Sequence, residues 1–151
     1  MSTLEVRFQA SFDSLAAIGR DAVSGGYNRL TWSQSDLQAR AWFVDQADRL
    51  GLSVEVDKNA NMWAWWGSGR QGAVATSSHL DTVVNGGAFD GALGVVSSFV
   101  AVKLLQETYK MRRKPVVIVA FVEEEGAILW CRGSTPGWAM WGRNWPPSSP
   151  S

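Results

Sequence analysis

One histidine and several carboxylates are concentrated in two short segments of this sequence, and each segment follows an apolar run. The first is Ser78-His79-Leu80-Asp81-Thr82, with Phe89-Asp90-Gly91 shortly after it. The second is Glu123-Glu124-Glu125-Gly126, directly after the apolar run 116–122. Imidazole and carboxylate groups bind divalent cations, and a two-metal hydrolase assembles its site from them. The pattern therefore predicts a hydrolytic metal centre.

His79 and Asp81 flank Leu80 at the carboxyl end of an expected strand. This edge of the sheet is where ligands bind in open α/β folds. Because side chains alternate along an extended chain, the spacing directs both side chains to the same side. Asp81 can then fix the tautomer of a metal-binding imidazole through a hydrogen bond. The tripeptide alone leaves open the alternative that His79 is only a satisfied polar residue.

The other acidic elements also have plain structural explanations. Asp90 precedes an expected helix, where aspartate is most often an N-cap, although the glycine-rich loop 85–91 also lets backbone approach an ion closely. The glutamates 123–125 can be a surface charge run. Like charges crowded at a strand end, however, cost stability unless a cation offsets them. Taken together, the three elements favour the metal centre.

Hydrophobic periodicity predicts the elements that position these residues. Helices are expected over 4–19, from Ser33 or Ser35 to 50, and over 91–107; strands are expected over 52–57, 61–66, 73–78 and 116–122. The first two strands form a hairpin. The continuous apolar character of 116–122 indicates burial on both faces, in the middle of a mixed or parallel sheet. The order of elements is that of an α/β domain.

The same patterns predict which residues are buried. We expect burial of strand 73–78 and of helix faces made of Leu4, Phe8, Phe12, Leu15 and Ile18, of Leu37, Trp42, Val44, Ala47 and Leu50, and of Val95, Phe99, Val102 and Leu105.

Composition excludes several classes of function. The 151 residues suffice for one domain. The 14 basic and 14 acidic side chains cancel, which argues against nucleic acid or a membrane as a partner. No apolar run is long enough to span a bilayer, and the N-terminus lacks the pattern of a signal peptide. A single cysteine, Cys131, excludes an internal disulfide and favours a reducing, cytoplasmic location.

The segments that carry the candidate residues resemble the peptidase-M20-like amidohydrolases. The similarity is carried by residues 78–83, 85–95 and 120–127, and upstream by 18–27 and 61–66. More narrowly, these segments resemble the hydantoinase/carbamoylase branch with allantoate amidohydrolase and N-carbamoyl-L-amino-acid hydrolase, leaning toward the former. The resemblance implies the N-terminal part of a zinc-exopeptidase-like catalytic domain, which is a mixed sheet flanked by helices.

The resemblance also implies a role for each candidate residue. His79 would ligate one metal ion, Asp90 would bridge two ions, and Glu125 would ligate the second. Asp81 would orient His79, and Glu124 would be the general base. The cofactor would be two divalent ions of zinc, manganese or cobalt. The reaction would be hydrolysis of the ureido C–N bond of allantoate or an N-carbamoyl-L-amino acid, with release of ammonia and carbon dioxide.

The resemblance ends at Ile128. Family members continue with a lid and dimerisation domain, further histidine ligands and contacts to the substrate carboxylate, so the substrate-binding residues and the homodimer interface are expected outside this sequence. Ala60 is a minor departure, because the family often has glycine in this turn.

The residues after Ala127 have a different composition. They contain no acidic residue and combine tryptophan with Gly, Ser and Pro, without a helical or strand period. Family members continue with Arg-Phe at this point, whereas this chain has Ile128-Leu129-Trp130, which is what a shifted reading frame gives. We therefore interpret 1–127 as the N-terminal part of the catalytic domain and 128–151 as an aberrant, disordered tail. Two alternatives to an active amidohydrolase stay open: a truncated product without activity, and a small metal-binding or interaction module that uses the tail.

Overall fold

A computed structural model describes residues 3–109 and 114–127, so the expected tail 128–151 lies outside the described residues. The elements in chain order are α1 (Thr3–Ala16), α2 (Gln34–Arg49), β1 (Ser53–Val56), β2 (Met62–Trp66), β3 (Val74–His79), α3 (Ala92–Thr108) and β4 (Val116–Phe121). This order is the predicted one, and most boundaries agree to within about two residues, the usual uncertainty of helix ends. None of these described helices is both long and apolar enough to cross a membrane.

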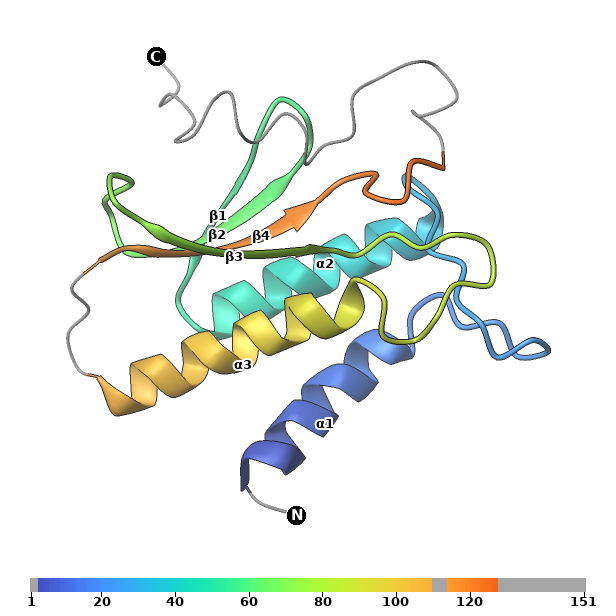
Figure 1. Cartoon of the computed structure of the whole chain (residues 1–151), viewed down its shortest axis with the longest axis horizontal. Coiled ribbons are helices and arrows are strands. Elements are labelled where there is room, and N and C mark those ends of the chain that lie inside the picture. The colour runs from blue at the N-terminus through green and yellow to red at the C-terminus, as the bar shows by residue number, and fades with distance from the viewer. Residues whose placement is uncertain (1–2, 110–113, 128–151) are drawn as a thin grey trace.

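The four strands form one mixed sheet with the order β1-β2-β4-β3. β2 pairs antiparallel with β1 and with β4, whereas β3 pairs parallel with β4. β4 therefore lies in the interior of the sheet, as its apolar run predicted. In Figure 1 the three helices all lie on the same side of this sheet. The predicted α/β class, with a mixed sheet and packed helices, is confirmed.

Both faces of the central strands are buried. Ile118 and Ala120 belong to the main core beneath the helices, whereas Val117 and Val119 belong to a second apolar cluster. Side chains alternate between the faces of a strand, so one continuous apolar run supplies both clusters. Trp63 and Trp65 on β2 join the second cluster at 4% and 1% exposure. This double burial explains why β4 is almost wholly apolar.

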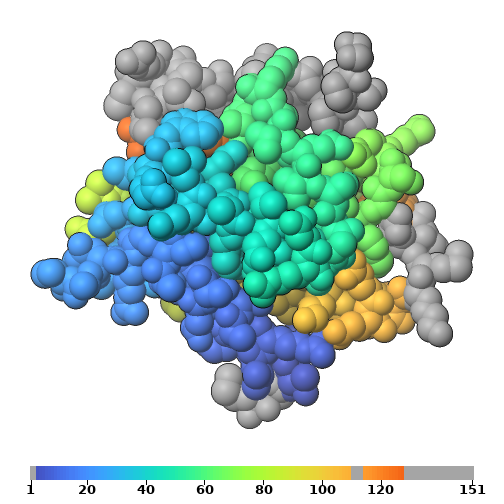
Figure 2. Space-filling model, turned by 180° about the vertical axis from the view of Figure 1, so that it is seen from behind, coloured from blue at the N-terminus to red at the C-terminus, as the bar shows by residue number. Residues whose placement is uncertain are grey.

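The ends of α2 follow the expected signals. Ser33 is the N-cap, and its side chain accepts a hydrogen bond from the backbone N–H of Asp36 at 3.2 Å. Gly51 follows the helix with φ 64°, a left-handed conformation that glycine adopts without a steric penalty. In Figure 2, which shows the molecule from behind, α2 crosses the middle of the surface and α1 lies below it.

The predicted burial of helix faces was partly wrong. Leu37 and Val44 of α2 are 47% and 36% exposed, because the buried stripe of this helix runs through Ala39 and Phe43. Residues four apart share a helix face, whereas Leu37 and Val44 are rotated away from that stripe. At the outer ends of α1 and α3, two further expected core residues, Leu4 and Leu105, are also exposed.

The prediction that strand 73–78 is buried was also wrong. Val74 is 53% exposed, and burial rises only toward the carboxyl end of β3, where His79 is 7% exposed. Among the described strands β3 pairs with β4 alone, so it occupies a sheet edge. Edge strands are commonly less apolar and less buried than central ones. The sequence of β3, with Thr76, Ser77 and Ser78, fits this position.

Candidate metal centre

The parallel pairing of β3 and β4 brings the two chemical segments to one edge of the sheet. His79, the last residue of β3, is the register partner of Phe121, the last residue of β4. The chain therefore leaves both strands at the same carboxyl edge, and the loops 80–91 and 122–126 lie next to each other (Figure 1). The expectation that the histidine and the acidic run meet at strand ends is thereby met.

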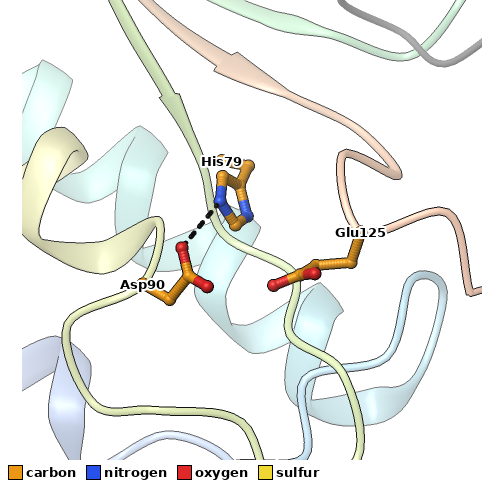
Figure 3. Close-up of side chains that lie close together, drawn as sticks. All are labelled: His79, Asp90 and Glu125. Atoms are coloured by element: carbon orange, nitrogen blue, oxygen red, sulfur yellow. Dashed lines mark ion pairs between the residues drawn. The ribbon is translucent and has the colours of Figure 1, made fainter.

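His79, Asp90 and Glu125 form a compact group of three potential ligands. One ligand atom from each of these residues lies within 4.8 Å of the others. His79 Nε2 is 3.5 Å from Asp90 Oδ1 and 3.5 Å from Glu124 Oε2. Figure 3 shows the carboxylates of Asp90 and Glu125 approaching the imidazole from two different loops. Their roles as metal ligands stay predictions, but the structure brings the predicted residues together.

Asp81 faces the other side of the imidazole. His79 Nδ1 lies 3.1 Å from the backbone oxygen of Asp81 and 3.6 Å from its Oδ1. A proton on Nδ1 can be donated to the backbone oxygen of Asp81, and Nε2 then faces the carboxylates of Asp90 and Glu124. Burial lowers the pKa of His79, but the nearby Asp81 and Glu124 outweigh it and raise the value to about 9. The imidazole is thus a polar group in a strongly negative environment.

Asp90 is not the N-cap of α3. The cap position is occupied by Gly91, with φ 65° and no side-chain hydrogen bond. The carboxylate of Asp90 turns toward His79 instead. The preceding Phe89 stacks on Phe12 of α1 with ring centroids 5.4 Å apart, which anchors the loop that carries Asp90. The structural explanation of Asp90 as a helix cap was therefore wrong.

The three glutamates after β4 are not a solvated surface run. Glu123 is 1% exposed and has φ 56°, and the backbone N–H of Gly126 donates to its carbonyl at 3.3 Å, so the chain turns here. Glu124 and Glu125 are half-buried and follow this turn toward His79. Burial raises the pKa of Glu125, and so do the neighbouring carboxylates, although the nearby His79 opposes the shift. A cation would relieve this crowding.

The donor set fits a divalent ion such as zinc, manganese or cobalt. One imidazole nitrogen and carboxylate oxygens are ligands that these ions accept in proteins. Asp90 is not used as a helix cap and is therefore available as a ligand. Burial and, to a smaller extent, the neighbouring carboxylates raise the pKa of Glu125. The backbone carbonyl near Nδ1 orients the imidazole. The residues present are thus compatible with the metal that the sequence predicts.

Two residues that sequence reasoning did not single out shape this site. A Cβ atom on Gly91 would lie 2.6 Å from the carbonyl oxygen of His79 and 2.7 Å from its ring, so only glycine fits. The glycine-rich loop was the signal for this close approach. Arg29 is fully buried and donates from Nε to the carbonyl of Leu80 at 2.8 Å. Nothing in its sequence surroundings distinguishes it from a surface arginine.

The fold and the site define a domain of the M28/M20-like class. The family model of peptidase family M28 matches residues 61–139, and the chain belongs to this family. The matched range runs past residue 127, where we expected the resemblance to end, and the domain boundary stays a prediction.

Individual relatives are named amidohydrolases. The chain is 35% identical over 130 residues to allantoate amidohydrolase of Bacillus subtilis, covering 82% of the chain and 31% of that protein. It is 37% identical over 123 residues to N-carbamoyl-L-amino-acid amidohydrolase of Rhizobium meliloti, covering 80% and 29%. A crystal structure of a hydantoinase/carbamoylase family amidase from Burkholderia ambifaria matches with a TM-score of 0.75 and 35% identity, covering 81% and 30%. The recognised family is thus confirmed, and the chain spans about 30% of the length of these relatives.

Proposed function

We propose that this chain carries one half of a two-metal amidohydrolase centre, in which His79, Asp90 and Glu125 hold divalent ions and Asp90 bridges the pair. The observation that carries this proposal is that their ligand atoms lie within 4.8 Å of one another at the carboxyl edge of the sheet. A bound zinc, manganese or cobalt ion would polarise the substrate carbonyl and lower the pKa of a water molecule.

Glu124 is the proposed general base. Its Oε2 lies 3.5 Å from His79 Nε2, and its side chain is 38% exposed, so it borders the candidate ligands and is open to solvent. In this role Glu124 takes a proton from the attacking water and returns it to the departing nitrogen. Asp81 holds the imidazole of His79 through Nδ1 and so keeps Nε2 directed into the site. These assignments follow the positions at which each residue stands in the family motif.

The proposed substrate class is a ureide or an N-carbamoyl-L-amino acid, and the bond cleaved is the ureido C–N bond. The names of the Bacillus and Rhizobium relatives support this class, because allantoate and N-carbamoyl-L-amino acids both contain a ureido group. Residues that contact the substrate carboxylate and a homodimer interface are proposed to lie outside the described residues. A cytoplasmic location fits the single cysteine of the sequence.

We further propose that the 151-residue polypeptide on its own does not turn over substrate. It contains one histidine in total, whereas a catalytic metal ion commonly has three protein ligands. Two ions would have to share His79, Asp90 and Glu125, which predicts weak binding. Binding by the chain alone should therefore need an excess of metal, and the site should be incomplete for catalysis.

The test uses the untagged chain, because a polyhistidine tag would add competing ligands. The chain is titrated with Zn²⁺ and Mn²⁺, and ammonia release from allantoate and from N-carbamoyl-L-amino acids is measured. Weak metal binding that His79→Gln and Asp90→Asn abolish, with no ammonia release, is expected. Equal metal binding by wild type and both variants would overturn the metal centre. Ammonia release that Glu124→Gln abolishes would overturn the proposed inactivity and support the base assignment. Tight stoichiometric binding without turnover would favour the metal-binding module instead.

A further inference from the structure

Arg29 is a buried cation next to the candidate metal centre. Its exposure is 0%, and its guanidinium donates from Nε to the carbonyl of Leu80 at 2.8 Å and from Nη1 to the carbonyl of Ile18 at 3.1 Å. Its Cζ lies 5.1 Å from the centroid of the Tyr27 ring. Arginine is rarely buried completely unless it is paired, because desolvating a charge is costly. Because burying this charge costs free energy, we expect Arg29 to have a role that a neutral side chain could not fill.

The ordinary compensation for a buried charge is not found here. Within residues 3–109 and 114–127 no carboxylate lies within ion-pair distance of Arg29, and Nη2 has no hydrogen-bond partner there. Burial lowers the pKa of Arg29, and the nearby side chains of Tyr27, Asp81 and Asp36 oppose this only in part. The guanidinium is therefore held mainly by two backbone carbonyls and an aromatic ring.

The carbonyl that Arg29 holds is at a sensitive position. Leu80 stands between His79 and Asp81, and its carbonyl belongs to the peptide bond between Leu80 and Asp81, the residue that orients the candidate ligand His79. Two further hydrogen bonds hold Thr82, two residues after Leu80. The N–H of Arg29 donates to Thr82 Oγ1 at 2.8 Å, and the N–H of Thr82 donates to the Arg29 carbonyl at 3.0 Å. Together these three bonds leave the segment 80–82 little freedom.

We propose that Arg29 is a positioning residue for the metal centre: it holds the Leu80 carbonyl so that Nδ1 of His79 stays against Asp81 and Nε2 stays in the site. This proposal rests on the proposed role of His79 as a ligand. The planar guanidinium is needed because it reaches the carbonyls of Ile18 and Leu80 at once. An ammonium group keeps the charge but has no fork that spans two carbonyls. A lysine at position 29 therefore separates positioning from charge.

Arg70 provides a matched control. It donates from Nη1 to the carbonyl of Gly67 at 3.4 Å, and its Cζ lies 4.0 Å from the centroid of the Trp65 ring. It thus combines a carbonyl and an aromatic ring as Arg29 does, but it is partly exposed, it also pairs with Glu55, and it lies in the loop between β2 and β3. That loop lies at the opposite end of the strands from the candidate metal centre, where Trp66 at the end of β2 pairs with Val116 at the start of β4.

The experiment compares Arg29→Lys with Arg70→Lys in the full 151-residue chain. Three quantities are measured: the unfolding midpoint in urea, the affinity for Zn²⁺ by calorimetry, and the imidazole ¹H–¹⁵N signals of metal-free protein. The chain has one histidine, so these signals belong to His79 without further assignment. We expect Arg29→Lys to weaken Zn²⁺ binding at least about tenfold, as loss of an outer-shell partner does, and to shift or broaden the His79 signals. Arg70→Lys should leave both within error of wild type.

Several outcomes decide the proposal. Wild-type Zn²⁺ affinity and unchanged His79 signals in folded Arg29→Lys would overturn it, because a purely structural role changes only the unfolding midpoint. Equal changes in both lysine variants would overturn it as well. If wild type binds no Zn²⁺, the proposed ligand role fails, and the metal-free His79 signals still decide whether Arg29 positions the imidazole. If Arg29→Lys does not fold, Arg29→Gln, which lacks the guanidinium fork and carries no charge to bury, replaces it in the same comparison.

Discussion

The backbone N–H of Glu125 donates a hydrogen bond of 3.1 Å to Asp81 Oδ2, across 44 residues of sequence. The other oxygen of Asp81 lies 3.6 Å from His79 Nδ1. One buried carboxylate therefore connects the loop after β3 to the loop after β4 and touches both a histidine and the backbone of a candidate ligand. Because hydrogen bonds to a charged acceptor are stronger than neutral ones, Asp81 fixes how the two loops meet.

The first prediction concerns this carboxylate. Asp81→Asn keeps an acceptor for the Glu125 N–H but removes the negative charge beside His79. The pKa of His79 should fall from about 9, because Asp81 is the main group that raises it. Zn²⁺ affinity should fall about 10–100-fold, the usual effect of losing an outer-shell carboxylate. An NMR titration of the single histidine and a calorimetric Zn²⁺ titration measure the two effects.

Asp36→Asn is the control for Asp81→Asn. Asp36 is also buried, and its Oδ2 also accepts one backbone N–H, that of Trp32, at 3.0 Å. Asp36→Asn should lower the free energy of unfolding, because it likewise weakens a hydrogen bond from a backbone N–H to a buried carboxylate. It should leave the Zn²⁺ affinity within a few fold of wild type. Wild-type Zn²⁺ affinity in Asp81→Asn would contradict the orienting role.

The second prediction follows from the same imidazole in metal-free protein. The pKa of His79 is raised from 6.5 to about 9 by folding, so the folded state binds the proton more tightly than the unfolded state. The resulting stabilisation is complete below the unfolded value and is lost as the pH rises through about 9. With chelator present, the free energy of unfolding of wild type relative to His79→Gln should therefore decrease between pH 6 and pH 10. Parallel pH dependence of the two proteins would contradict the raised pKa.

Some features of the fold were predictable because they depend on local pattern. The apolar run of β4 placed it inside the sheet, and strand-end positions of His79 and Glu125 predicted that they meet. Parallel pairing of two strands is sufficient to bring their carboxyl ends together, so no detailed packing was needed. Local hydrogen bonding also narrowed the capping residue of α2 to Ser33 or Ser35, of which the structure uses Ser33.

Other features depend on contacts between distant segments. The exposure of Val74 on β3 results from the place of that strand at the sheet edge, and the periodicity of a strand does not encode its neighbours. The burial of Arg29 is set by the carbonyls of Ile18 and Leu80, which come from two other segments. Asp90 satisfied the rule for an N-cap in sequence, but the tight approach of Gly91 to His79 decided the geometry.

The third prediction concerns that approach. Gly91→Ala places a methyl group 2.6 Å from the His79 carbonyl and 2.7 Å from the ring atoms, at φ 65°. Gly91 combines this φ with ψ −55°, a sparsely populated conformation in which a non-glycine residue costs about 1–3 kcal/mol, and overpacking adds about 1–3 kcal/mol. The variant should unfold at lower urea and lose Zn²⁺ binding, because relief of the clash moves His79.

Gly87→Ala is the control in the same loop. A Cβ on Gly87 meets no atom within 4 Å, so both stability and Zn²⁺ affinity should stay close to wild type. Urea unfolding and calorimetry on the two variants provide the comparison. Equal behaviour of the two alanine variants would show that the close contact to His79 does not constrain the site.

The fourth prediction concerns the turn between β1 and β2. Ala60 has φ 67°, and its N–H donates to the Asp57 carbonyl at 2.8 Å, so an alanine holds a left-handed position within a tight turn. Glycine removes a penalty of about 1–2 kcal/mol there but loses about 0.4–1 kcal/mol through the greater freedom of its unfolded chain. Ala60→Gly should therefore raise the free energy of unfolding by up to about 1.5 kcal/mol. Ala101→Gly, at an exposed position inside α3, is the same substitution at a helical position and should lower it by about 1 kcal/mol. Urea unfolding of both variants measures the two effects, and a loss of stability in both would contradict a left-handed backbone at residue 60.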